Sequence, residues 1–520
     1  MNSDDNFLDV INQLQDAFIT CRKSMSLASL HKSIETIHRL KITVCREAND
    51  RVPVNTLPDE ILLEVFKQSL LRKDPCPTVV LGYRSYGRVE TRPLLLLTHV
   101  CRQWRSTALA CSVLWQRIDC RNLEQFEEFA LRRSAPGPIS LFYLVPPSRL
   151  HTSNLLFPIP SLADRLRRLD IAYPAEAGYD NLHERLRSMH CPNLECLTVT
   201  KSNSSSDYAN LAVLRTLICQ AKLPRLRALA MTHVSEWLPS DLPPSLTHLF
   251  LSFLHYNGIP LSSILNILAH LPALEILHIS HYNQVAQMAD GQHGEPIQLP
   301  RLKLIILVNM PSLARSLALM RPLAIPSSCR VYLHHLYRSD SAISMLADSV
   351  ISGLPATENT NRLTLAARFS NLEIVADGTS SGFWLNVKLS SAAGTEEDRS
   401  VWLSRLPTMF PLSTLSSLQL RLNLPGSTIT QILRETICLT TLEVMIVFDD
   451  ATQHGGADSE DSLIHICHAL SQDDNRGSQS ILCPALHSLT IVMPDYREDR
   501  TNTGDPYLVT CKSRPQAVKP

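Results

Sequence analysis

Two stretches of sequence, LPDEILLEVF at 57–66 and THVCRQWRSTALACSVLWQRI at 98–118, decide the fold of the N-terminal part of the chain. Pro58 suits the first turn of a helix, and the carboxylates of Asp59 and Glu60 complement the positive end of the helix dipole. An apolar face with helical spacing follows, made of Ile61, Leu62, Val65, Phe66 and Leu70. The second stretch repeats that spacing through Val100, Trp104 and Leu109 and closes on Leu114-Trp115. The two stretches therefore predict a small helical domain.

These residues resemble an F-box. That family begins with Leu-Pro and a leucine-rich helix, continues with Val-Cys-x-x-Trp and ends in Leu-Trp, and all three signatures occur in this order within residues 57–118. One departure is an insertion at 72–93, which contains Pro75, Pro77, Gly82 and Gly87 where the family has a short loop. An insertion between helices costs little closure entropy. The arrangement is similar to F-box variants of mushroom-type fungi, which carry a helix ahead of the box.

The resemblance implies a partner, the Skp-family adaptor of a cullin–RING ubiquitin ligase. A segment of this size cannot bury all of its large apolar residues internally, which also favours a docking surface. The residues that would form or support the adaptor-binding helices are Leu57, Pro58, Ile61, Leu62, Phe66, Val100, Cys101, Trp104, Leu114 and Trp115. Catalysis would then belong to other subunits, and this chain would contribute proximity as a non-catalytic receptor.

Residues 7–48 are predicted to be helical. Apolar residues fall mostly three or four apart and no Pro or Gly interrupts them, although Lys41 occupies a place where another apolar residue should fall. Two alternatives stay open, a short coiled coil and a helix that packs on the next domain of the same chain. The apolar positions are Leu14, Phe18, Cys21, Met25, Leu30, Ile34, Ile37 and Val44.

The C-terminal two thirds of the chain is repetitive. The pattern L-x-x-L-x-hydrophobic begins at Leu166, Leu194, Leu226, Leu246, Leu274, Leu302, Leu415, Leu442 and Leu486. The first six starts are 28, 32, 20, 28 and 28 residues apart. Such a period is typical of leucine-rich repeats, in which each copy supplies one short strand with alternate residues inward. In the copy at 274–279, Leu277 is expected to point inward, and Glu275 and His278 outward.

The repeat is irregular. The Asn that ends the usual repeat is mostly missing, and the register is lost between about 310 and 410, where Val331/Leu333 and Trp384–Leu389 are candidate degenerate strands. Segments 264–271 and 343–350 are candidate return helices. The predicted fold class is α+β: an N-terminal helix and a three-helix F-box, then an irregular leucine-rich-repeat α/β solenoid. The predicted domains are 1–50 (helix), 51–120 (F-box with its insertion), 121–160 (linker and start of repeats), 161–495 (repeats) and 496–520 (polar, disordered tail).

Composition limits the other functions. Lys+Arg and Asp+Glu both total 49, so bulk charge predicts no nucleic-acid or membrane partner. Gly is scarce, at 16 of 520 residues, which argues against glycine-loop nucleotide binding. The N-terminus is too polar for a signal peptide, and the apolar runs are too short for a spanning helix. The 14 cysteines show no C-x-x-C spacing and are expected to be free thiols in the cytoplasm or nucleus.

Several other His and Cys residues have the spacing of candidate chemical sites. His465, Cys467 and His468 lack the third and fourth ligands that a metal needs, and His278 and His281 would face opposite sides of a strand. Cys191 and Cys196 are not expected to pair in a reducing compartment. His190, His334 and His335 have no nucleophile partner at a recognised spacing. We therefore expect no catalytic residue, no cofactor and no metal.

The sequence thus predicts a substrate receptor of a Skp–cullin–F-box ubiquitin ligase, which binds the adaptor through the box and an unidentified target protein through the repeats. The alternative is a non-catalytic scaffold whose repeats act without cullin recruitment.

Overall fold

The computed structural model is a mixture of helices and sheets. It describes residues 3–71, 91–119, 124–144, 160–173, 191–201, 223–234, 242–253, 259–282, 295–311, 313–336, 354, 357, 359–368, 371–388, 409–421, 426–445, 464, 466–467, 470, 483–493 and 507–512. The chain divides into two compact units, Met1–Pro138 and Ile139–Pro520. No described helix is both long enough and apolar enough to cross a membrane.

The N-terminal unit begins with two helices, α1 (Ser3–Cys21) and α2 (Leu27–Asp50), where the sequence predicts one helix over 7–48. The break has a local cause. Ser26 has extended backbone angles, and its side chain accepts a hydrogen bond from the Ser29 backbone N–H at 3.2 Å. Ser26 therefore acts as an N-cap and starts a second helix inside the predicted one.

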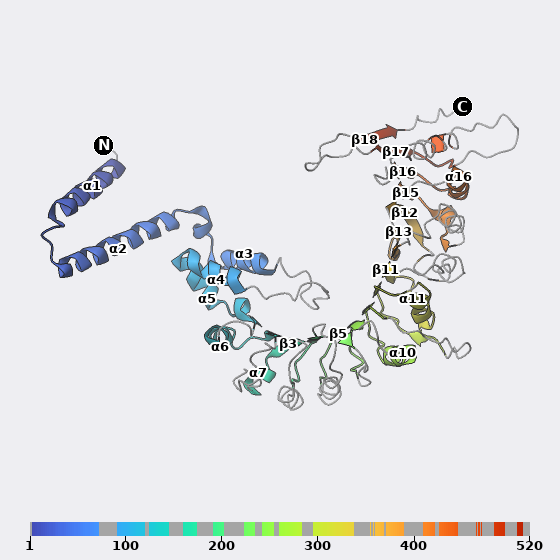
Figure 1. The fold of residues 1–520 in the computed structure, drawn as a ribbon, viewed down its shortest axis with the longest axis horizontal. Helices are drawn as coiled ribbons and strands as arrows, with labels where there is room; N and C mark the ends of the chain where they lie inside the picture. The colour runs from blue at the N-terminus through green and yellow to red at the C-terminus, as the bar shows by residue number, and fades with distance from the viewer. Residues whose placement is uncertain are drawn as a thin grey trace. The chain divides into compact units, whose positions relative to one another are not determined.

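Short helices form the rest of this unit (Figure 1). They are η1 (Pro53–Thr56), α3 (Asp59–Leu71), α4 (Thr91–Val100), α5 (Arg102–Ala110), η2 (Ser112–Trp115) and α6 (Glu124–Arg133), with a short strand β1 (Arg117–Asp119). The insertion expected at 72–93 ends before residue 93, because α4 already begins at Thr91. Pro93 lies in the first turn of α4, where a missing N–H leaves no helical hydrogen bond unmade.

The C-terminal unit is built on strands that are hydrogen-bonded in the order β2-β3-β4-β5-β6-β7-β9-β11-β14-β13-β12-β15-β16-β17-β18. Their bounds are β2 (Ile139–Leu144), β3 (Leu166–Tyr173), β4 (Cys196–Lys201), β5 (Ala228–Val234), β6 (His248–Phe253), β7 (Ile276–Ser280), β9 (Leu304–Val308), β11 (Arg330–Leu336), β12 (Thr360–Arg368), β13 (Asn371–Gly378), β14 (Gly382–Lys388), β15 (Ser417–Arg421), β16 (Thr441–Met445), β17 (Ser488–Met493) and β18 (Tyr507–Lys512). A separate parallel pair joins β8 (Ile297–Gln298) to β10 (Leu323–Ala324).

The second motif residue of each copy aligns across neighbouring parallel strands from β3 to β9. Leu169, Leu197, Leu229, Leu249, Leu277 and Ile305 are consecutive partners in this register. Each of these side chains is at most 1 % exposed. One face of the strands is therefore an apolar core, built by the period-2 alternation of the sequence.

The prolines ahead of the motifs make the turns that enter the strands. The backbone N–H of Leu274 donates to the carbonyl of Leu271, with Pro272 between them. The same bond, with Pro in the same place, precedes the strands at Leu194, Leu226, Leu246, Leu302 and Leu486. Proline presets the backbone angle at the second position of such a turn. The recurring Pro thus explains how a Gly-poor chain makes repeated turns.

Between 330 and 421 the parallel order is interrupted. β12, β13 and β14 form an antiparallel meander, which enters the array in reverse order between β11 and β15. A tight turn, in which the Gly378 N–H donates to the Ser381 carbonyl at 2.9 Å, replaces a long return segment. This meander is why the L-x-x-L pattern fails here. Val331 and Leu333 lie on β11, and most of Trp384–Leu389 lies on β14.

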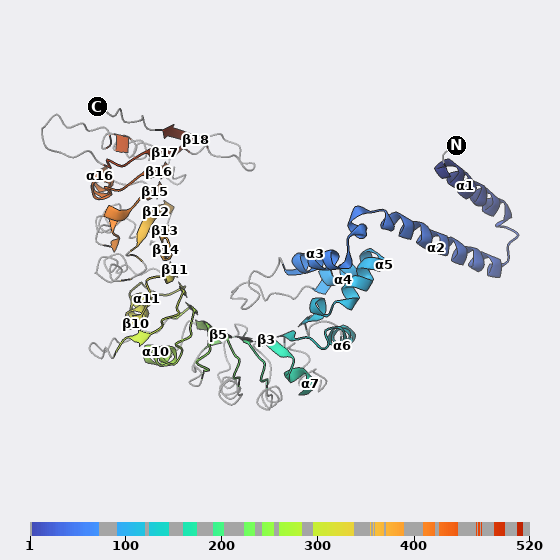
Figure 2. The ribbon, with the colours of Figure 1, turned by 180° about the vertical axis from the view of Figure 1, so that it is seen from behind.

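Helices occur on one side of the strands in the C-terminal unit, as Figures 1 and 2 show for α10, α11 and α16. They are α7 (Pro160–Ala163), α10 (Leu261–Ala269), α11 (Leu313–Met320), η5 (Leu412–Thr414) and α16 (Gly426–Glu435). α10 overlaps the return helix predicted at 264–271, whereas residues 343–350 lie outside the described residues. Within the tail expected to be disordered, β18 pairs antiparallel with β17, because the free edge of β17 offers backbone groups to the chain.

Candidate functional site

The helices of the N-terminal unit are fixed by a small aromatic core. Leu62 and Phe66 of α3 are fully buried, and the Phe66 ring lies 5.0 Å from the Trp104 ring of α5. Trp115 is also buried; its indole N–H donates to the Ala108 carbonyl at 2.8 Å, and its ring meets Phe129 edge-on. These contacts hold α3, α5 and η2 as one body.

Polar bonds set the positions of α3 and α5. The indole Nε1 of Trp104 donates to Oδ1 of Asn55 at 2.6 Å, and Nδ2 of Asn55 donates to the Asn49 carbonyl at 2.7 Å. At the start of α3, Oδ1 of Asp59 accepts from the Thr107 hydroxyl at 3.0 Å. The short segment from Asn55 to Asp59, which leads into α3, is thus hydrogen-bonded to the end of α2 and to α5.

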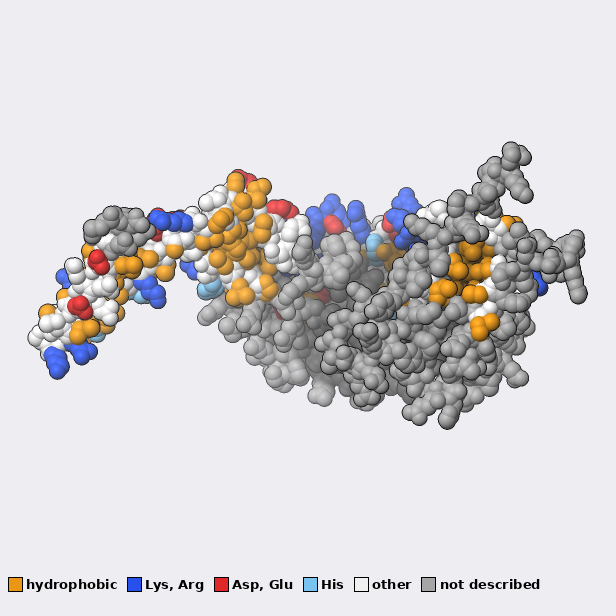
Figure 3. Space-filling view, turned by 90° about the horizontal axis from the view of Figure 1, so that it is seen from above, with side chains coloured by type: hydrophobic (Ala, Val, Ile, Leu, Met, Phe, Trp, Pro, Cys, Tyr) orange, Lys and Arg blue, Asp and Glu red, His pale blue; other side chains and the backbone are white. Residues whose placement is uncertain are grey.

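The surface of these helices is unusually apolar. Exposed large side chains occur on α3, α4 and η2, and Figure 3 shows hydrophobic side chains gathered over α3–α5. Ile61 and Val65 lie four residues apart on one face of α3, and Leu96 and Val100 have the same spacing on α4. We call the following set the apolar helical surface: Ile61 (52 % exposed), Val65 (41 %), Leu95 (37 %), Leu96 (57 %), Val100 (49 %) and Val113 (50 %).

The ten residues named from sequence fall into three groups. Pro58, Ile61 and Val100 are exposed. Leu57, Cys101 and Trp104 are partly buried, and Cys101 accepts the Trp104 backbone N–H at 3.5 Å at the start of α5. The remaining four, Leu62, Phe66, Leu114 and Trp115, belong to the core and are at most 8 % exposed. The first group can touch a partner directly, whereas the core group supports the surface from beneath.

Sequence reasoning missed several residues of this site. Asn55 and Thr107 form the hydrogen bonds that orient α5, and nothing in their local spacing identifies them. Leu95, Leu96 and Val113 are part of the apolar helical surface. The run of four leucines at 94–97 was a usable signal, since a surface helix buries only one stripe.

The strands of the C-terminal unit present a second face, opposite the apolar core. Aromatic and apolar residues occupy the same register there on neighbouring strands: Phe250, His278, Ile306, Tyr332, Trp384 and Val375. We call this set the open-face ladder. Tyr332 is 42 % exposed and its ring stacks on Trp384 with centroids 4.8 Å apart. The stacked rings of Tyr332 and Trp384 are therefore the part of the ladder suited to packing against apolar groups of a partner.

His278 differs from the expectation that it would face solvent. It lies on the opposite face from Leu277, but its ring packs edge-on against Phe250 at 4.4 Å. Burial, with a smaller contribution from His281, lowers the pKa of His278 to about 4. Glu275 is partly buried and pairs with Lys303 at 2.6 Å, and the hydrogen bond from Lys303 lowers the pKa of this carboxyl.

Buried hydroxyls lie beside the ladder. Ser252 and Ser280 are adjacent partners on β6 and β7, and they are 0 % and 3 % exposed. Neither hydroxyl has a hydrogen-bond partner among the described residues. A buried hydroxyl without a hydrogen bond costs free energy, so these two side chains destabilise the sheet locally.

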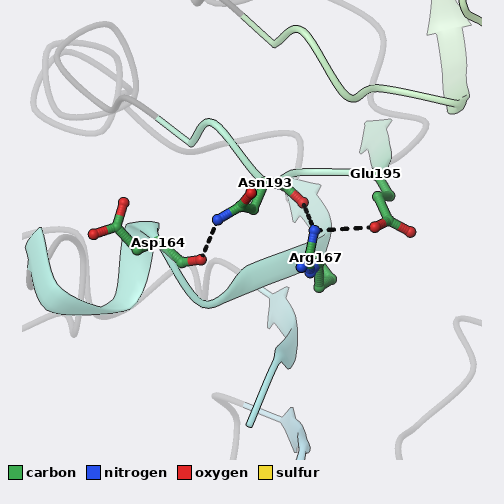
Figure 4. A network of polar contacts seen from close by, with 4 residues as sticks. All are labelled: Asp164, Arg167, Asn193 and Glu195. Atoms are coloured by element: carbon green, nitrogen blue, oxygen red, sulfur yellow. Dashed lines mark hydrogen bonds and ion pairs between the residues drawn. The ribbon is translucent and has the colours of Figure 1, made fainter. Parts of the chain in front are cut away.

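Charged residues line the edge where the strands begin. Arg167 donates to Glu195 at 3.1 Å and to the Asn193 carbonyl at 3.3 Å, and Asn193 donates to the Asp164 carbonyl at 2.7 Å (Figure 4). The Arg167 and Glu195 side chains are 36 % and 41 % exposed, so their ion pair contributes little stability. Its geometric role is to tie the turn before β4 to β3.

The candidate metal and thiol residues do not converge. Among the described residues, no group of three or more His, Cys, Asp or Glu side chains could hold a metal ion. Nε2 of His281 accepts from Nδ2 of Asn309 at 2.9 Å, and Cys191 and Cys196 are both free thiols. Burial raises the pKa of Cys191 to about 11. His190, His335, His465 and His468 lie outside the residues described in detail.

Comparison with known proteins identifies one segment. Residues 54–121, which run from η1 past β1 and include the whole apolar helical surface, match the family model described as F-box-like. No curated protein matches the chain. F-box domains typically bind Skp-family adaptors.

Proposed function

We propose that this chain is a substrate-recognition subunit of a Skp–cullin–F-box ubiquitin ligase. The observation that carries the proposal is the coincidence of the apolar helical surface with the F-box-like segment. Six large aliphatic side chains are exposed on three short elements whose own core is already filled. Such a concentration of apolar area marks a protein interface.

In this proposal the Skp-family adaptor covers the apolar helical surface and brings the cullin–RING ligase with it. Ile61, Val65, Leu96 and Val100 make the direct contacts. Trp104, held by Asn55 and Phe66, sets the angle of α5 behind them. The chain itself supplies no catalytic group, and its contribution to ubiquitin transfer is the raised effective concentration of a bound target.

The strands would form a degenerate leucine-rich-repeat array that binds the target through the open-face ladder. Support comes from the aligned L-x-x-L-x-hydrophobic register and from the exposed ring of Tyr332, which stacks on the partly buried ring of Trp384. The proposed locations are the cytoplasm and nucleus, where this machinery operates.

Co-expression of the full chain with a Skp-family adaptor tests the docking half of the proposal. Ile61→Asp combined with Leu96→Asp should reduce adaptor co-purification at least tenfold, because two charges would be buried in an apolar interface. Ile437→Asp is the matched control, since Ile437 is an equally exposed aliphatic residue, at 54 %, in the other unit. Equal adaptor binding by all three chains would overturn the proposal.

A scaffold that binds the adaptor without cullin recruitment is the second candidate. Reconstitution with adaptor and cullin separates the two. A ternary complex of this chain, adaptor and cullin that forms only when the adaptor is present supports the ligase subunit. Stable adaptor binding that excludes cullin supports the scaffold.

A further inference from the structure

The helix α2 carries a heptad pattern that the F-box-like segment does not explain. Counting Leu27 as position a, the a and d positions through the whole helix are Leu27, Leu30, Ile34, Ile37, Lys41, Val44 and Ala48. Six of these seven residues are apolar. A 3.5-residue apolar repeat of this kind is the signature of a coiled-coil seam.

The seam has no partner within the described structure. No residue of α2 is buried. The exposed fractions of its aliphatic side chains are 70 % for Leu27, 62 % for Ile34, 50 % for Ile37, 43 % for Leu40 and 45 % for Val44. The alternative of packing against the neighbouring domain of the same chain therefore lacks any contact that buries this stripe. Most of the stability of helices in proteins comes from packing of an amphipathic face, and this face of α2 (24 residues) is not packed among the described residues.

The charges of α2 are arranged away from the seam. Arg39 pairs with Glu35 at 2.5 Å, and Arg51 pairs with Glu47 at 3.2 Å, both within the same helix. Lys32, Glu35, Arg39 and Arg46 fall at heptad positions b and f, on the side opposite the seam. Most charged groups of α2 are thus placed to remain in water when the apolar stripe is covered.

An identical helix fits this seam. The positions that flank a coiled-coil seam, e and g, would bring Ser33 beside the second copy's His38, and Leu40 beside its Cys45. Neither pairing sets like charges against one another, so two copies of α2 meet without the repulsion that usually selects against self-pairing. The aliphatic types are mixed: Ile34 at a with Leu30 at d favours two strands, whereas Leu27 at a with Ile37 at d is the combination of higher oligomers, so the single polar a residue, Lys41, has to set the number of strands.

Lys41 indicates the direction of the pairing. In a parallel arrangement in register, the two Lys41 residues share one layer and every other layer stays apolar. An antiparallel arrangement would place each Lys41 opposite an aliphatic residue and would disturb two layers. The long Lys stem can carry its ammonium group out to water from a single layer.

We propose that α2 pairs with α2 of a second copy of this chain as a parallel two-stranded coiled coil. The self-association does not depend on the proposed ligase role. If that role also holds, each complex would display two open-face ladders, and a target with two binding segments would gain avidity.

The test is the solution mass of the full chain, measured by sedimentation equilibrium from 0.1 to 50 µM. We expect a species of two 58.2 kDa chains. Ile34→Asp combined with Ile37→Asp should give a monomer. The matched control is Thr36→Asp combined with Thr43→Asp, which adds the same charge at β-branched residues of the same helix but at heptad position c. A monomeric unchanged chain, or equal dissociation of the control, would overturn the proposal.

Two further variants keep the test decisive if the double aspartate chain folds poorly. Lys41→Ile should tighten the dimer at least tenfold, because it removes the one polar layer. A mixture of the Lys41→Glu chain with the unchanged chain should form the mixed dimer in preference to either parent at low salt, since a parallel pairing sets Glu opposite Lys. No preference for the mixed dimer would contradict the parallel arrangement.

Discussion

Trp104 and Asn55 are 49 residues apart in the chain and are joined by a 2.6 Å hydrogen bond from the indole Nε1 to the side-chain Oδ1. Because Asn55 also donates to the carbonyl of Asn49, this one amide connects the end of α2, the turn η1 and the helix α5. The apolar helical surface depends on that connection, since α5 packs behind both α3 and α4.

Asn55→Ala is therefore expected to destabilise the N-terminal unit by about 1–2 kcal/mol, because it leaves a partly buried indole N–H unpaired. The measurement is urea unfolding followed by tryptophan fluorescence. Asn55→Asp is the comparison variant, since it keeps an acceptor for Trp104 while it replaces the donor to the Asn49 carbonyl with a charged carboxylate oxygen. A loss in Asn55→Asp as large as in Asn55→Ala would mean that the Trp104 bond is not the important one.

Replacement of both Leu57 and Pro58 by Ala is expected to weaken adaptor binding at least tenfold while the C-terminal unit stays folded. The change removes apolar contact area and the preset first turn ahead of α3. Adaptor affinity is measured by titration calorimetry, and folding by thermal melting. Unchanged affinity would show that Leu57 and Pro58 do not contribute to adaptor docking.

The insertion offers a separate prediction. Residues 72–90 can be exchanged for a short Gly/Ser linker with a change in adaptor-binding free energy of less than about 1 kcal/mol, because closure entropy depends only logarithmically on loop length. The exchange must end before Thr91, where α4 begins. A linker that also replaces residues 91–93 should cost more, since it removes the first turn of α4. If the shorter exchange abolishes binding, the insertion itself contacts the adaptor.

The lowered pKa of His278 predicts that the stability of the C-terminal unit depends on pH. Its pKa is about 4 when folded, below the usual 6.5, so between these values the unfolded chain binds more protons. Stability from this group is complete above about pH 6.5 and is lost as the pH falls toward 4, by at most about 3 kcal/mol. His278→Gln should flatten the slope in thermal melts between pH 7 and pH 4. His270→Gln, a substitution of an exposed histidine, serves as the control and should leave the slope in place.

The stacked pair Tyr332 and Trp384 can be disturbed from a neighbouring position. A Cβ added at Gly382 would lie 2.6 Å from the Cη2 atom of Trp384, so Gly382→Ala should displace that ring from Tyr332. The expected signals are a shifted tryptophan emission and weaker target binding with adaptor binding unchanged. Identical emission and target affinity would remove Trp384 from the proposed recognition face.

Several features of this structure can be predicted from short-range patterns in the sequence. The alternation in L-x-x-L-x-hydrophobic places Leu277 and its partners on the buried face. In the F-box-like segment, the Leu-Pro signature directly precedes α3, and Val-Cys-x-x-Trp runs from the end of α4 into α5. In six copies, a proline two residues before the first Leu of the motif marks the turn that leads into the strand. These features depend on neighbours within a few residues, so the sequence carries them directly.

Side-chain burial and strand order depend on residues that are distant in sequence, so only the tertiary structure determined them. Ile61 and Leu62 are adjacent aliphatic residues, yet one is 52 % exposed and the other is fully buried, because only the second meets the core built around Phe66. The same holds for His278, whose burial comes from Phe250 on the next strand. The reversed meander β12–β13–β14 also follows from strand pairing across the sheet. Periodicity determines which side of an element a residue occupies, and only long-range packing determines what covers that side.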